Sequence, residues 1–152
     1  SSYAGINGMI GGQMIDIASE GKKIDLETLK YIHSNKTGKL MKLPVELACI
    51  IGDADKEEKE ILVKFADLIG LAFQIKDDIL DIEGDFSTLG KPVGSDIELG
   101  KSTYPALIGM AESKALLKET IAEAKTIVAE KFGVEKSNIL LELADYIGNR
   151  NK

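Results

Sequence analysis

The sequence is poor in the residues on which disulfide-linked and thiolate-metal proteins depend. It has one cysteine, one histidine, three prolines and no tryptophan in 152 residues. Cys49 cannot form an internal disulfide, and the apolar run 47–51 around it indicates a small core residue. His33 has no histidine or cysteine partner, so it is interpreted as a packing or surface residue and not as a metal ligand.

Excess positive charge and long apolar runs are absent as well. The chain carries 25 acidic and 19 basic residues, a formal charge of -6, which argues against nucleic acid or an anionic membrane as the main partner. No apolar stretch approaches the roughly 18 residues of a membrane span. The start lacks an initiator methionine and a signal-peptide pattern. We therefore expect a soluble, cytoplasmic chain that begins within a longer protein.

Strand-like alternation is missing too, and apolar residues recur at helical spacing instead. The fold class is therefore predicted to be all-α, in one domain. Helices are expected over 3–20, 25–51, 55–82 and 103–110, followed by one that ends at Gly133 and one that ends at Gly148.

Several residues modify these expectations locally. Asp25 is a plausible N-cap, and Asp55 with Glu58 forms a capping-box pattern. Pro44 is expected to kink or divide the second helix. The first helix contains Gly5, Gly8, Gly11 and Gly12, each of which costs about 1 kcal/mol of helix propensity. That helix must therefore be held by close packing against a neighbour.

A run of three aspartates interrupts the third helix. In Phe73–Asp81 (FQIKDDILD), Asp77 and Asp81 lie one turn apart, with Asp78 between them and Gln74 one turn earlier. Each aspartate is roughly 0.5 to 0.7 kcal/mol worse than alanine in a helix, so a function should offset that cost. Mg²⁺ commonly takes one or two carboxylates and keeps waters and substrate phosphates as its other ligands. The alternative is a solvated acidic face.

A glycine-rich loop over residues 84–100 follows directly and contains Lys91, with Lys101 just after it. Loops this long in compact domains are usually functional. Lysines near a carboxylate-metal site would suit a diphosphate.

These residues resemble the trans-prenyltransferases, which join isopentenyl diphosphate to an allylic diphosphate. FQIKDDILD is similar to their second aspartate-rich motif. Four further segments match in order: GMIGGQMID (8–16), HSNKTGKL (33–40), TLGKPVGSDIELGKSTYPALIG (88–109) and ADYIGNRNK (144–152). Together they cover nearly the whole chain, and bacterial farnesyl diphosphate synthases are the most similar members. The resemblance implies the carboxy-terminal half of an isoprenoid synthase type I helical bundle.

The resemblance also implies roles for individual residues. Asp77, Asp78 and Asp81 would hold Mg²⁺, and Lys36 would contact the allylic diphosphate. Thr37 and Gln74 would turn oxygen dipoles toward the carbocation formed when diphosphate leaves.

Other roles carry open alternatives. The loop 84–100 would act as a lid through Lys91, with Lys101 as a second diphosphate contact. Arg150 and Lys152 resemble a basic tail that reaches isopentenyl diphosphate, the alternative being a disordered terminus. Asp16 would pair with a site lysine, or lie on the helix surface.

One part of the family pattern is missing from these 152 residues. The first aspartate-rich motif and its paired arginines have no counterpart, so the chain is expected to form half of a cavity and to be inactive alone. The full-length protein is predicted to be a homodimeric farnesyl diphosphate synthase. A synthase of geranylgeranyl or longer products and a non-catalytic helical subunit are the alternatives.

Overall fold

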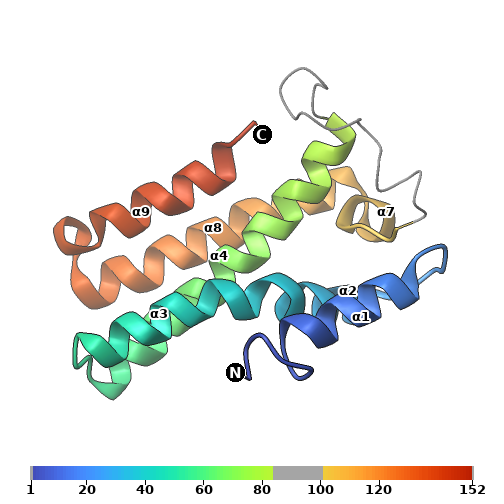
Figure 1. Ribbon diagram of the computed structural model, residues 1–152. Helices are drawn as coiled ribbons and strands as arrows, with labels where there is room; N and C mark the ends of the chain where they lie inside the picture. Colours follow the sequence, from blue (N-terminus) through green and yellow to red (C-terminus); the bar gives the residue numbers. More distant parts are fainter. Residues whose placement is uncertain (1, 84–100, 152) are drawn as a thin grey trace.

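Helices make up all the regular structure in the part of the chain that the computed structural model describes, residues 2–83 and 101–151 (Figure 1). In chain order they are α1 (Met9–Ser19), α2 (Leu26–His33), the π-helix η1 (Ser34–Gly38), α3 (Lys39–Ile51), α4 (Lys56–Glu83), α7 (Tyr104–Ile108), α8 (Met110–Phe132) and α9 (Val134–Asn149). The predicted all-α class is confirmed. None of these helices combines the length and apolar character needed to cross a membrane.

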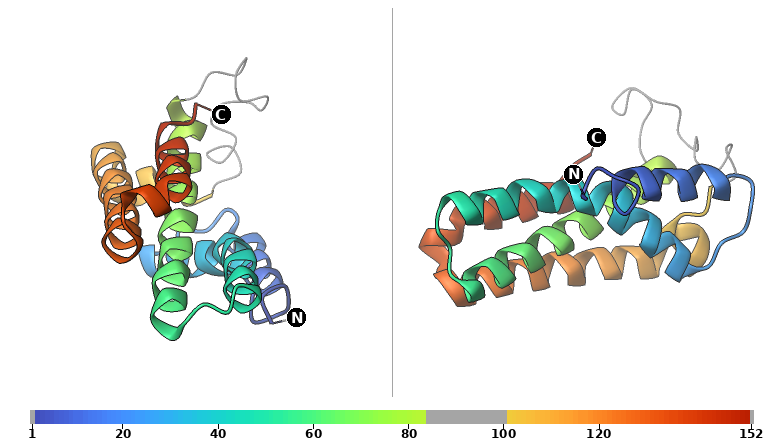
Figure 2. Two further views of the ribbon diagram at one scale, coloured as in Figure 1. Left: turned by 90° about the vertical axis from the view of Figure 1, so that its left-hand side faces the viewer. Right: turned by 60° about the horizontal axis from the view of Figure 1, so that its bottom comes forward.

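The long helix α4 is the centre of the arrangement. It packs against α8 and α9 on one side and against α3 and η1 on the other, as the end-on view in Figure 2 shows. Its members of the hydrophobic core cluster recur every three or four positions: Phe65, Ile69, Ala72, Ile75 and Ile79. Its start is the predicted capping box, because the Glu58 amide donates to Asp55 Oδ1 (2.8 Å) and the Asp55 amide donates to Glu58 Oε2 (3.0 Å).

The first helix is shorter than predicted. It begins at Met9, and residues 2–8 form turns closed by backbone hydrogen bonds from Gly8 to Gly5 (2.9 Å) and from Met9 to Tyr3 (2.8 Å). The early glycines explain the difference, since glycine favours turns over the interior of a helix.

The second predicted helix is divided, but not at Pro44. Asp25 caps α2 as predicted, accepting the Thr28 amide at 2.8 Å. The interruption lies in η1, and Pro44 lies inside α3, which continues to Ile51. π-Helical turns inside α-helices are frequent at functional sites, and η1 contains the predicted site residues Lys36 and Thr37.

Close packing of the first helix is confirmed at Gly12, which is buried. A Cβ atom there would lie 2.4 Å from the Lys36 amide nitrogen and 2.9 Å from the Asn35 carbonyl carbon. Only glycine permits this approach of α1 to η1.

The last helices differ from expectation at one end. Thr103 caps α7, Pro105 lies in its first turn, and Gly133 (φ 81°) separates α8 from α9. Gly148 does not end α9, which continues to Asn149. A Cβ at Gly148 would lie 3.5 Å from Ile121 Cγ1, an ordinary contact with α8.

Gly12→Ala should destabilise the protein by about 1–3 kcal/mol, because its new methyl group overlaps backbone atoms that cannot rotate away. Urea unfolding followed by far-UV circular dichroism measures the change.

Gly148→Ala is the matched control, also a glycine inside a helix. It should be neutral or stabilising by up to about 1 kcal/mol, because alanine favours helix and the space at Ile121 accepts a methyl. Equal destabilisation of the two variants would contradict the close approach of α1 to η1.

Candidate active site

A small polar cavity of about 100 Å³ lies where α1, α2, η1, α4 and the segment before α7 meet. Its walls are formed by Asp16, Ser19, Ile24, Leu29, Ile32, His33, Lys36, Gln74, Asp77, Asp78, Lys101, Ser102 and Thr103. Five of these are predicted site residues: Lys36, Gln74, Asp77, Asp78 and Lys101. The fold therefore gathers residues from three distant parts of the sequence.

The lysines of the cavity share one carboxylate. Lys36 Nζ lies 2.6 Å from Asp16 Oδ2, and Lys101 Nζ lies 3.9 Å from the same oxygen. The Asp16 side chain is only 17% exposed, so the pair is partly shielded from water and stronger than a surface ion pair. The expected pairing of Asp16 with a site lysine is confirmed.

The three aspartates of α4 occupy different environments. Asp77 is the accessible one, with its side chain 42% exposed, and it lies 3.4 Å from Arg150 Nη2. Asp78 is 6% exposed and accepts the backbone N–H of Tyr104 at 2.8 Å, which ties α4 to the start of α7. Asp81 is 1% exposed and does not line the cavity among the described residues. Among these three aspartates of α4, Asp77 is the one that both lines the cavity and has an exposed carboxylate.

His33 belongs to the cavity wall, although its sequence context gave it no role. Burial lowers the pKa of its imidazole to about 4; the Asp16 charge opposes this shift and the Lys36 charge adds to it. Its ring centroid lies 5.5 Å from that of Tyr104. Its place three residues before Lys36, on the same helical face, is the signal that could have identified it.

Other predicted residues lie outside this group. Thr37 lies in η1 next to Lys36 but is not in the described wall of the cavity. Lys91 and the predicted lid over 84–100, together with Lys152, lie outside the described residues. Ser19, Ser102 and Thr103 line the cavity without having been predicted.

The donor atoms at Asp77, Asp78 and Gln74 are all oxygens that suit Mg²⁺. Across residues 2–83 and 101–151, however, no three carboxylate, imidazole or thiolate groups converge as a complete metal site. The arrangement therefore fits a half-site, in which Asp77 would supply the accessible ligand and substrate phosphate and water would supply the rest.

Known proteins resemble this chain over its whole length. Residues 4–135 match the family profile described as "Polyprenyl synthetase". The chain is 44% identical to farnesyl diphosphate synthase from Escherichia coli (strain K12), an alignment that covers 100% of this chain and 52% of that relative. It is 42% identical to the heterodimeric geranylgeranyl pyrophosphate synthase large subunit 2 of Arabidopsis thaliana, over 97% of this chain and 40% of that protein.

A solved structure agrees with these sequence matches. The geranyltransferase from Helicobacter pylori, complexed with magnesium and isoprenyl diphosphate, superimposes with a TM-score of 0.78 at 27% identity, covering 98% of this chain and 48% of the other. The chain spans about half the length of the curated relatives it matches. The predicted resemblance and fold are both confirmed.

The pH dependence of stability should report the burial of His33. In the unfolded chain its pKa is near 6.5 and in the folded protein near 4, so the unfolded state binds the extra proton between these values. The free energy of unfolding should fall as pH decreases from 6.5 to 4, and this slope should be smaller in His33→Gln.

Direct titration by proton NMR is unambiguous, because the chain has one histidine. A midpoint near 6.5 in the folded protein would contradict burial of the imidazole.

Proposed function

This chain belongs to the polyprenyl synthetase family, and we propose that it forms the carboxy-terminal half of a magnesium-dependent farnesyl diphosphate synthase. The full-length protein would condense isopentenyl diphosphate with dimethylallyl or geranyl diphosphate. The observation that carries this proposal is the meeting of Lys36, Lys101 and the accessible carboxylate of Asp77 in one cavity. A diphosphate that is bridged to a metal ion needs lysine ammonium groups for its own oxygens and a carboxylate for the metal, close together.

Lys36 and Lys101 would bind the allylic diphosphate. Both ammonium groups face Asp16, so one partly buried carboxylate holds two cations near a common point before substrate arrives. Charge-assisted contacts from lysine to phosphate oxygens are among the stronger hydrogen bonds in proteins. Asp16 would thus position the phosphate-binding groups.

Asp77, with Asp78 and Asp81 as ligands or water-mediated partners, would hold magnesium, which would supply Lewis-acid neutralisation of the diphosphate charge. Gln74 in the wall and Thr37 would direct oxygen dipoles toward the allylic cation, an electrostatic stabilisation of developing charge. The isopentenyl double bond then attacks that cation, and loss of a proton gives a product longer by one isoprene unit.

The remaining assignments complete the proposal. Residues 84–100 would close over the diphosphate through Lys91, and Arg150 with Lys152 would reach the second diphosphate. A homodimer of the full-length protein and a cytoplasmic location stay predictions.

Two other functions fit parts of the data. The first is a synthase of a longer product, which the similarity to a protein named geranylgeranyl pyrophosphate synthase large subunit supports. The second aspartate motif is common to all product lengths, so it does not distinguish this function from farnesyl diphosphate synthesis. A non-catalytic helical subunit has less support, since it would have no reason to keep three costly aspartates in α4.

Asp77→Ala in the full-length protein should lower turnover by roughly a hundredfold or more, because it removes the accessible ligand of a Lewis-acid metal. Helicity should not change, since this half-exposed side chain contributes little to packing. Steady-state kinetics at saturating magnesium and far-UV circular dichroism provide the measurements.

Asp145→Ala is the control, an aspartate on α9 that pairs with the exposed Lys125. Turnover within about twofold of wild type is expected there, as for most surface substitutions. If Asp77→Ala behaved like Asp145→Ala, the metal-ligand assignment would be wrong.

Residues 1–152 alone should not catalyse prenyl transfer, whereas the full-length protein should yield farnesyl diphosphate. Two diphosphates would place several negative charges beside the few cations of this half, and unpaired buried charge is prohibitive. A cavity open to solvent would also let water quench the carbocation. Chromatography of products from labelled isopentenyl diphosphate, geranyl diphosphate and magnesium tests both statements.

Farnesyl product from residues 1–152 alone would contradict the half-cavity argument. A product of twenty carbons or more from the full-length protein would contradict the farnesyl assignment while leaving the family intact.

A further inference from the structure

Arg150, the residue that caps the end of α9, is fixed against α4 by several contacts. Its Nη2 donates to the Phe73 carbonyl oxygen at 3.2 Å, and its guanidinium carbon lies 4.1 Å from the Phe73 ring centroid. The side chain is only 9% exposed. A buried arginine with a stacked ring beneath it has lost most of its rotamer freedom. Its charge is therefore held at one place.

That place is beside the accessible aspartate of the cavity. Arg150 Nη2 lies 3.4 Å from Asp77 Oδ1. Phe73 and Asp77 are one helical turn apart in α4, so the ring and the carboxylate form two adjacent contacts for one guanidinium. The end of α9 thus supplies a cation to a carboxylate that lines the same cavity as Lys36 and Lys101.

We propose that Arg150 is a positioning residue for Asp77, holding its carboxylate as an internal counter-ion that a divalent cation must displace. This inference rests on the proposed function, because it takes Asp77 as the accessible ligand. It assigns Arg150 a role before substrate arrives, in addition to the predicted contact with a diphosphate.

The physical basis is competition for one carboxylate. A guanidinium at Asp77 satisfies part of its charge, and it repels a second cation that approaches the same oxygens. Once displaced, the guanidinium remains beside α4 through its contacts with the Phe73 carbonyl oxygen and ring, where an incoming diphosphate would offer it new acceptors. Removal of the Arg150 guanidinium should therefore raise the affinity for the metal and lower the affinity for the diphosphate.

The first measurement uses Mn²⁺ as the probe, titrated into the 152-residue chain and followed by electron paramagnetic resonance of the free ion. Arg150→Gln should bind Mn²⁺ roughly three- to tenfold more tightly than wild type, the range that a partly exposed ion pair supports. Arg150→Lys keeps the positive charge but loses the planar guanidinium that stacks on Phe73, so its Mn²⁺ affinity should lie between those of wild type and Arg150→Gln.

The second measurement titrates inorganic pyrophosphate in the presence of saturating Mn²⁺, by calorimetry. Here Arg150→Gln should bind more weakly, by roughly threefold or more, because a cationic phosphate contact has been lost. If Arg150 had only a structural role, Arg150→Gln would weaken the binding of both Mn²⁺ and pyrophosphate, or of neither. If Arg150 only bound substrate, Arg150→Gln would leave the Mn²⁺ affinity unchanged.

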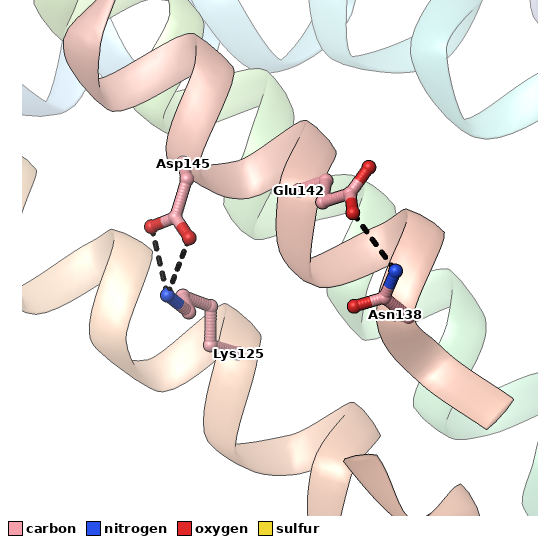
Figure 3. Close-up of polar contacts among 4 residues, drawn as sticks. All are labelled: Lys125, Asn138, Glu142 and Asp145. Carbon is pink, nitrogen blue, oxygen red and sulfur yellow. Dashed lines mark hydrogen bonds and ion pairs between the residues drawn. The ribbon is translucent and has the colours of Figure 1, made fainter. Parts of the chain in front are cut away.

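Lys125 provides the matched control variant. Its Nζ lies 2.7 Å from both carboxylate oxygens of Asp145, an ion pair that joins α8 to α9 away from the cavity (Figure 3). Lys125→Gln removes a cation that contacts α9, as Arg150→Gln removes one that α9 contributes. It should leave both affinities within about twofold of wild type.

A further variant covers the case in which Arg150→Gln fails to fold. Phe73→Leu keeps the guanidinium but removes the ring beneath it, and it should raise Mn²⁺ affinity by roughly twofold. Unchanged or weaker Mn²⁺ binding in a folded Arg150→Gln, or in Phe73→Leu if the former does not fold, would overturn the inference.

Asp77→Ala separates this inference from the proposed function. If Asp77→Ala leaves Mn²⁺ binding intact, or if no chain binds Mn²⁺ saturably, the metal assignment itself fails. If Asp77→Ala abolishes binding but Arg150→Gln changes nothing, only the role of Arg150 fails.

Discussion

One helix has to satisfy two opposed demands, and the rest of the structure depends on how it does so. α4 packs against helices on both of its sides, which requires apolar residues over most of its surface, yet it also carries three carboxylates. Asp78 is accommodated because the backbone N–H of Tyr104 donates to it inside the core. Asp77 remains partly exposed because its side of α4 faces the cavity. Packing on both sides of α4 thus determines which aspartate is available for chemistry.

The positive side of the cavity depends on a different constraint, the approach of two backbones. Gly12 lets α1 lie against η1 at a distance that no side chain would permit, and Asp16 follows one turn later on α1. The carboxylate of Asp16 therefore reaches Lys36 within η1 and lies near Lys101. The absence of a side chain at Gly12 thus lets the Asp16 carboxylate on α1 come within ion-pair distance of the Lys36 ammonium group in η1.

The remaining faces of the molecule are consistent with a chain that spans about half of its relatives. An apolar groove of about 410 Å³ lies between α3, α4 and α9. Large hydrophobic residues that are at least two-fifths exposed include Ile6, Ile10, Met14, Ile17, Leu40, Leu47, Ile50, Ile51, Ile139 and Leu143. These residues belong to the turns before α1 and to α1, α3 and α9. Exposed apolar side chains of this kind suit further packing against other helices, as the proposed function requires.

The sequence by itself determined the helical class, the extent of α4 and its capping box, and the carboxylate motif, because these depend on local periodicity and short-range hydrogen bonds. It also indicated Lys36 and Gln74 through motif resemblance. The tertiary structure alone decided the interruption at η1 instead of Pro44, the inclusion of His33, and the contrast between exposed Asp77 and buried Asp81. It alone brought Arg150 to Asp77, 73 residues apart. Burial and pairing between distant segments arise from helix packing, and helical periodicity carries no information about which helices meet.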